Sequence, residues 1–174
     1  WMVIIMFGKE DRKGMEMVLH FIHTRFPQLR SLMYVVNTKR NDTFYDLPVK
    51  LYHGESYITA SIDNLKFRIS PKSFFQTNSG QAARLYKVAL DYADIKPHEH
   101  VYDLYCGTGT ISCLAARHAK QVTGIEYVED AVKDARLNAE LNGLNNLSFH
   151  SGDLKNLLTH DFFLSHGRPD MMII

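Results

Sequence analysis

The sequence predicts an α/β fold with a parallel sheet, preceded by a small α+β region. From residue 97 onward, short apolar runs alternate with segments of helical periodicity, the pattern of parallel strands joined by right-handed crossovers. VYDLYCGTG at Val101–Gly109 has the form of a buried strand that ends at an acidic residue and turns through a glycine loop into a helix. Residues 1–70 lack this alternation. We therefore expect a small α+β region over 1–70 and the parallel-sheet domain over 71–174.

Composition bounds the class of protein. Among 174 residues 45% are hydrophobic, which excludes a disordered chain, and a net charge of +1 does not by itself indicate a nucleic-acid partner. Two cysteines are too few for a disulfide framework and indicate a reducing, cytoplasmic location. No apolar run approaches the roughly 18 residues of a membrane span. Because the chain begins at Trp1 and ends on the apolar run Met171–Ile174, we expect it to be a fragment of a longer protein.

The first region is expected to contain one helix among short strands. Val18, Phe21, Ile22 and Arg25 recur at helical spacing, and Pro27 ends the segment, which predicts a helix over Met15–Phe26. The β-rich apolar runs predict strands at Trp1–Phe7, Ser31–Asn37, Val49–His53, Ser56–Ile62 and Leu65–Ser70, the last two joined by a turn at Asp63-Asn64.

The segment Ser70–Ser79 (SPKSFFQTNS) has no helical or strand alternation, so we expect a loop whose two phenylalanines are buried anchors. Either it only connects two regions, or it also contacts a ligand through Gln76 or Asn78. Asn78 or Ser79 can cap the helix predicted over Gly80–Ala93.

The remaining pattern alternates strands and helices. Strands are expected at Val101–Leu104, Val122–Ile125, Leu147–His150 and Asp170–Ile174, with helices at Thr110–Ala119, Val128–Asn142 and near Leu154–Leu158.

Acidic residues follow three consecutive predicted strands. Gly107 and Gly109 form a G-x-G, but Ser112 replaces the third glycine of the dinucleotide fingerprint. Asp103, Glu126 and Asp153 lie at strand ends, where ligands of parallel sheets bind, and Glu126 is placed to accept hydrogen bonds from ribose hydroxyls. Carboxylates suit a cationic adenosine derivative without pyrophosphate, and S-adenosylmethionine fits that description. Asp103 could instead cap the loop, and Asp153 could instead cap a helix.

Three segments together resemble one enzyme family. SPKSFFQTN at Ser70–Asn78, DLYCGTGT at Asp103–Thr110 and GIEYVEDAVKDARLNAELNG at Gly124–Gly143 are similar to the RNA uracil-C5 methyltransferases, which make 5-methyluridine in bacterial ribosomal and transfer RNA. The resemblance is strong over Leu65–Asp153 and weaker before Leu65. It implies a Rossmann-like methyltransferase sheet, of which this chain would hold the first half.

The resemblance also implies roles for individual residues. Gln76 would contact the methionine end of the cofactor, Tyr105 would pack on it, Glu126 would hold the ribose, and Asp153 would lie by the adenine. Gly107 belongs to the cofactor loop, and Thr110 stands where some members have an asparagine that touches the cofactor.

In this family a cysteine thiolate adds to uracil C6 so that C5 can attack the methyl group, and a base then removes the C5 proton. That cysteine and base are expected beyond Ile174, so this chain alone should be inactive. Cys106 would face the wrong ligand and Cys113 is expected in the core; neither forms a metal site with histidine.

Two questions stay open at this level. One alternative function is a methyltransferase of another substrate class, such as an exocyclic-amine modifier of nucleic acid; another is a nicotinamide-dependent enzyme or nucleotide-binding module. Five basic residues around the FFQ loop form either a solvated face or contacts to RNA phosphates: Lys66, Arg68, Lys72, Arg84 and Lys87. The oligomeric state is not predicted.

Overall fold

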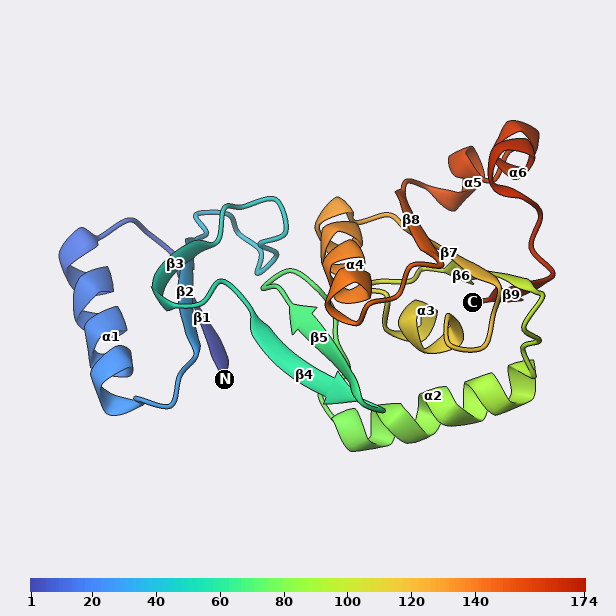
Figure 1. Cartoon of the computed structure of the whole chain (residues 1–174). Helices are drawn as coiled ribbons and strands as arrows, with labels where there is room; N and C mark the ends of the chain where they lie inside the picture. The colour runs from blue at the N-terminus through green and yellow to red at the C-terminus, as the bar shows by residue number, and fades with distance from the viewer. The chain divides into compact units, whose positions relative to one another are not determined.

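A computed structural model describes residues 1–174, and the chain divides into two compact units (Figure 1). The first comprises residues 1–58 and 70–72, and the second comprises 59–69 and 73–174. The boundary expected from the sequence lay at residue 70, whereas residues 59–69, on either side of the Asp63-Asn64 turn, belong to the second unit. The reason is apolar burial: one cluster joins Ile62, Leu65, Phe67, Ala82, Tyr86, Cys113 and Leu114.

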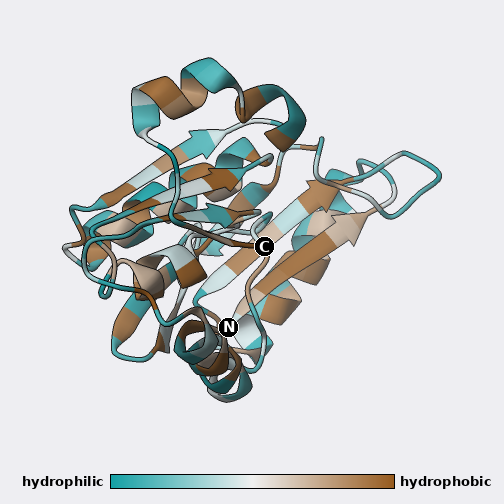
Figure 2. Ribbon diagram, turned by 90° about the vertical axis from the view of Figure 1, so that its right-hand side faces the viewer, coloured by the Kyte–Doolittle hydropathy of each residue, from teal (hydrophilic) through white to brown (hydrophobic).

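The first unit is a β-α-β arrangement with one added strand. β1 (Met2–Phe7) pairs in parallel with β2 (Ser31–Val36), and β2 pairs antiparallel with β3 (Lys50–Gly54). Helix α1 (Arg12–Arg25) connects β1 and β2 and buries Met15 and Leu19. The apolar strands β1 and β2 appear largely brown in the hydropathy colouring (Figure 2). This agrees with the small α+β region expected for the start of the chain.

The second unit begins with a hairpin and a long helix. β4 (Ile58–Ile62) and β5 (Leu65–Ile69) are joined by Asp63 and Asn64, both at positive φ, as the predicted tight turn requires. Helix α2 (Ser79–Ala93) is capped by Asn78, whose side chain accepts a hydrogen bond from the Gln81 amide.

The main sheet has four parallel strands in the order β8-β7-β6-β9. These strands are β6 (His100–Leu104), β7 (Gln121–Glu126), β8 (Leu147–Ser151) and β9 (Met171–Ile173). Because all four strands run the same way, the carboxyl ends of β6, β7 and β8 lie at the same end of the sheet. These ends are Leu104, Glu126 and Ser151. The α/β parallel sheet expected from the sequence is confirmed.

Helices cover both faces of this sheet. One apolar cluster under α3 (Thr110–Ala115) includes Val101, Ala115 and Val122, while Val132 and Ala135 of α4 (Glu129–Leu141) pack with Phe149. On the other face, α5 (Leu154–Leu157) and α6 (His160–His166) pack against Tyr102, Leu104 and Ile125. Helix α3 is shorter than predicted, and α6 was not predicted. No helix combines the length and apolarity needed to cross a bilayer.

Candidate cofactor site

The loop between β6 and α3 has a backbone that ordinary residues rarely adopt. Tyr105, Gly107 and Gly109 all have positive φ, at 63°, 55° and 75°. A Cβ added at Gly109 would lie 3.0 Å from both the Ala135 Cβ and the Phe149 ring, whereas one at Gly107 would meet nothing within 4 Å. Gly109 therefore allows close packing beneath the loop, and Gly107 keeps its outer side open. Positive φ at a tyrosine is a strained conformation of the kind that gathers at binding sites.

Asp103 is buried beneath this loop. Its side chain is 3% exposed, and its Oδ2 accepts a hydrogen bond from the Ser112 hydroxyl at 2.5 Å. Burial raises the pKa of the Asp103 carboxyl to about 6, although the hydrogen bonds from Ser112 act in the opposite direction. Of the two roles considered from the sequence, this geometry is that of the loop cap. Ser112, which replaces the third glycine of the dinucleotide fingerprint, is the partner that completes it.

Glu126 ends β7 and spans two neighbouring loops. Its Oε2 accepts a hydrogen bond from the Gly107 amide at 3.1 Å, and its Oε1 accepts one from the Val128 amide at 2.8 Å. The amide that would face a pyrophosphate in a dinucleotide site is thus bonded to a carboxylate. The Glu126 side chain remains partly exposed, and it lines a neighbouring cavity.

A cavity of about 220 Å³ opens at the carboxyl ends of β6, β7 and β8. Three of the residues expected at the cofactor, Tyr105, Glu126 and Asp153, line it. Tyr127, which sequence reasoning missed, lies on its wall, and both tyrosines are largely exposed, at 66% and 70%. The remaining lining residues are Ile125, Gly152 and Leu154, so no basic side chain contributes. Two carboxylates and two aromatic rings suit a cationic nucleoside better than a phosphate-bearing one.

The structure places the other expected residues outside this cavity. Thr110 is buried at the start of α3, with its hydroxyl 3.3 Å from that of Thr108. Gln76 is half-buried in the segment before α2. In that segment Phe75 packs against Phe67 with ring centroids 5.9 Å apart, but Phe74 is 75% exposed. The expectation of two buried phenylalanine anchors is therefore half wrong, because Phe75 contacts the Phe67 ring whereas Phe74 is exposed to solvent.

Asp153 has a structural task in addition to lining the cavity. Its Oδ1 accepts a hydrogen bond from the Lys155 amide at 2.9 Å and caps α5. The alternative considered from the sequence, a helix cap, is thus observed. Since a carboxylate has several acceptor positions, capping leaves it able to accept a further hydrogen bond in the cavity.

Both cysteines are buried and unsuited to nucleophilic attack. Cys113 is 0% exposed in the apolar cluster shared by α2, α3 and the hairpin. Cys106 does not face the cavity but packs below the loop against Val132, Ala135 and Phe149. Burial raises the pKa of the Cys113 thiol to about 12 and moves the pKa of Cys106 in the same direction. A thiol is nucleophilic as its thiolate, so the sequence-based exclusion of both residues agrees with their surroundings.

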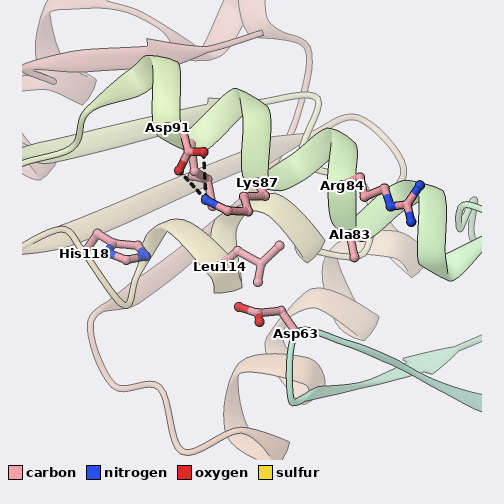
Figure 3. Close-up of a pocket in the computed structure, with 8 residues that line it drawn as sticks. Asp63, Ala83, Arg84, Lys87, Asp91, Leu114 and His118 are labelled. Atoms are coloured by element: carbon pink, nitrogen blue, oxygen red, sulfur yellow. Dashed lines mark hydrogen bonds and ion pairs between the residues drawn. The ribbon is translucent and has the colours of Figure 1, made fainter.

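A larger cavity, of about 420 Å³, lies elsewhere in the second unit, between α2, α3 and the β4–β5 turn (Figure 3). Ala83, Leu90 and Leu114 contribute apolar surface to it. Two members of the basic cluster, Arg84 and Lys87, line it as well, but Lys87 is engaged with Asp91 at 2.8 Å. None of the residues expected at the cofactor lines this cavity, and neither Arg84 nor Lys87 lines the cavity at Glu126.

Comparison with known proteins gives a consistent result. Residues 95–173 match the family described as "Methyltransferase domain". Two similar relatives are both named "Uncharacterized RNA methyltransferase". The one from Porphyromonas gingivalis is 51% identical over 172 residues, and the one from Bacteroides thetaiotaomicron is 46% identical over 175. Each alignment covers 99% of this chain but only 37% or 38% of the relative, so the chain spans just over a third of their length.

Solved structures share the fold. The tRNA (uracil-54, C5)-methyltransferase of Pyrococcus abyssi, solved in complex with S-adenosyl-L-homocysteine, is similar with a TM-score of 0.61 and 27% identity, covering 75% of this chain and 32% of that one. The tRNA m1G37 methyltransferase of M. jannaschii has a TM-score of 0.57 and 16% identity, covering 87% and 46%. The second likeness shows the fold alone. The Rossmann-like methyltransferase fold expected for this chain is confirmed.

Proposed function

We propose that this chain, whose residues 95–173 match a methyltransferase domain, forms the cofactor-binding part of an RNA uracil-C5 methyltransferase that makes 5-methyluridine. The coarser assignment, an S-adenosylmethionine-dependent RNA methyltransferase, is supported by the methyltransferase-domain match over residues 95–173 and by relatives that align over nearly the whole chain. The choice of uracil C5 is supported by the three sequence segments and by the 27% identity to the P. abyssi enzyme.

The observation that carries the proposal is the cavity at Glu126. S-adenosylmethionine is the cofactor that the domain match and the P. abyssi complex indicate, and the residues present fit it. Glu126 and Asp153 offer carboxylate acceptors to hydroxyl and amino groups of a nucleoside, while Tyr105 offers a ring face. When bound, the cofactor supplies a sulfonium methyl group as the electrophile.

The nucleophilic step requires a residue that this chain does not offer. Uracil C5 becomes a carbon nucleophile only after a thiolate has added to C6. The chain has two cysteines, and both are buried with raised pKa values. We therefore assign this chain cofactor binding and assign the C6 nucleophile and the C5 base to another part of the whole protein. We assign the residues that would hold the target uracil out of the RNA base stack to that other part as well.

The cofactor assignment is tested by calorimetric titration of this chain with S-adenosyl-L-homocysteine and, separately, with NAD⁺. We expect saturable one-to-one binding of the first and none of the second. Binding of NAD⁺ alone would favour the nicotinamide alternative and remove the methyltransferase proposal.

The substrate assignment needs a full-length relative, and the 51% identical P. gingivalis protein is a suitable choice. It should be incubated with uridine-containing transcripts and labelled cofactor, followed by nucleoside mass spectrometry. We expect the added methyl group on the uracil ring as 5-methyluridine. A methyl group on the exocyclic amine of adenosine, guanosine or cytidine in its place would favour the exocyclic-amine alternative. Separate ribosomal and transfer RNA transcripts would decide the class of RNA.

A further inference from the structure

Three polar residues lie one turn apart along α4 and at its C-cap. They are Asp134, Asn138 and Asn142, and the first two are 3% and 0% exposed. Polar groups are costly to bury unless they form hydrogen bonds, so the partners of these side chains show what the helix holds in place.

The two asparagines pair with the free edge of β5. Asn142 accepts a hydrogen bond from the Lys66 amide at 2.8 Å and donates one to the Lys66 carbonyl at 2.7 Å. Asn138 accepts from the Arg68 amide at 2.6 Å and donates to the Arg68 carbonyl at 3.2 Å. Residues two apart in a strand direct their backbone groups to the same edge. Each side-chain amide therefore takes the place of a residue in a neighbouring strand.

Asn138 makes one contact that Asn142 does not. Its second N–H donates to the carbonyl of Thr108, in the glycine loop, at 3.0 Å. The corresponding N–H of Asn142 donates to the Asn138 carbonyl, within the helix, at 2.7 Å. Asn138 thus links β5 directly to the loop that carries Gly107 and Gly109.

The same helix also holds the segment that follows β5. The Ser73 hydroxyl donates to Asp134 Oδ2 at 2.8 Å, and Asp134 lies one turn before Asn138. Ser73 is three residues before Gln76 in the chain. Ser73 and Thr108, which are 35 positions apart in sequence, are therefore attached to consecutive turns of one helix.

We propose that Asn138 is a positioning residue: it fixes the glycine loop relative to β5 and to the segment containing Gln76, and so sets the separation between the two parts of the cofactor site. This rests on the proposed function in one respect, namely that both segments contact S-adenosylmethionine. The attachment of the loop to β5 does not depend on that assignment. Asn142 is the matched control, because it makes the same paired hydrogen bonds to β5 but none to the loop.

The test compares Asn138→Ala with Asn142→Ala in this chain. Two quantities are measured: affinity for S-adenosyl-L-homocysteine by calorimetry, and amide hydrogen exchange of peptides covering residues 103–112 without ligand. We expect both variants to lose thermal stability. Only Asn138→Ala should show affinity lowered at least tenfold relative to Asn142→Ala, together with faster exchange in the loop.

Several outcomes would overturn the proposal. Equal loop exchange in the two variants would make Asn138 an ordinary structural residue, whatever the affinity. If the unaltered chain does not bind S-adenosyl-L-homocysteine, the proposed function fails, and loop exchange alone decides the role of Asn138. Should Asn138→Ala not fold, Asn138→Ser takes its place, with the same expectation. Failure of both to fold while Asn142→Ala folds would assign Asn138 to stability alone and refute its role in positioning.

Discussion

The Ser112 hydroxyl donates a hydrogen bond to the buried carboxylate of Asp103, across the mouth of the loop that joins β6 to α3. The two residues are nine apart in sequence, and the bond closes the loop over Cys106 and Thr108, which are also buried. A serine at the third position of the glycine motif is therefore compatible with a tight loop. Its hydroxyl adds a side-chain hydrogen bond to the backbone hydrogen bond that Ser112 also gives to this desolvated carboxylate.

The buried Asp103 should make stability depend on pH. Its pKa is about 6 in the folded chain and near 3.8 as a free side chain. Between these values the folded state binds more protons than the unfolded state, so stability falls as pH rises from about 4 to about 6. The contribution is on the order of 2–3 kcal/mol.

This is measured by urea unfolding of the parent chain and Asp103→Asn at pH 4 and pH 7. The amide has no carboxyl to titrate, so the variant should gain stability relative to the parent as pH rises. Ser112→Ala, which removes a hydrogen bond that lowers this pKa, should extend the window to higher pH. A stability difference between parent and Asp103→Asn that is constant with pH would contradict the prediction.

Removal of the Glu126 carboxylate should weaken cofactor binding. Glu126→Ala loses acceptors at the cavity, and we expect S-adenosyl-L-homocysteine affinity to fall tenfold or more, about 1–3 kcal/mol for a hydrogen bond to a charged group. Glu129→Ala is the control, because Glu129 is exposed on α4 and pairs with Lys133. Calorimetry that gives the same affinity for Glu126→Ala and the parent would remove Glu126 from the site.

The two glycines of the loop should respond differently to alanine. At Gly109 the new Cβ would approach Ala135 and Phe149 at 3.0 Å with φ at 75°, so Gly109→Ala should lose about 2–5 kcal/mol of stability. At Gly107 there is open space and only the positive φ is unfavourable, so Gly107→Ala should lose about 1–2 kcal/mol.

If the proposed function holds, we expect the ligand to approach the backbone on the open side of Gly107. Gly107→Ala should therefore remain folded at 25 °C but bind S-adenosyl-L-homocysteine more weakly than the parent. Chemical denaturation and calorimetry on the two variants provide the comparison. Equal losses of stability in the two variants would show that the close packing of Gly109 against Ala135 and Phe149 does not determine which residues the loop tolerates.

Neither thiol should react in the folded chain. Burial raises the pKa of Cys113 to about 12 and raises that of Cys106 too, so little thiolate is present at neutral pH. With an aromatic disulfide reagent at pH 7.5 we expect negligible labelling of the native chain. After unfolding in urea we expect both cysteine thiols to be labelled. Rapid labelling of one thiol under native conditions would reopen the question of a nucleophile within this chain.

Local patterns predicted most of the elements but not the boundary between the units. The strand that contains Asp103, the cap at Asn78 and the Asp63-Asn64 turn all follow from neighbouring residues. The assignment of β4 and β5 depends on which apolar surface Phe67 finds, and its partners Tyr86 and Leu114 are distant in sequence. Helix α6 was missed because HDFFLSH is too short to show a full helical period.

The sequence by itself determined the parallel sheet, the acidic residues at its strand ends and the class of cofactor, because strand period, glycine spacing and residue type are local properties. Only the tertiary structure decided that Asp103 is a loop cap, that Tyr127 joins Tyr105 at the cavity, and that Asn138 connects β5 to Thr108. Each of these depends on which groups the folded chain brings together from separate elements. That is a property of the whole arrangement, and no local pattern contains it.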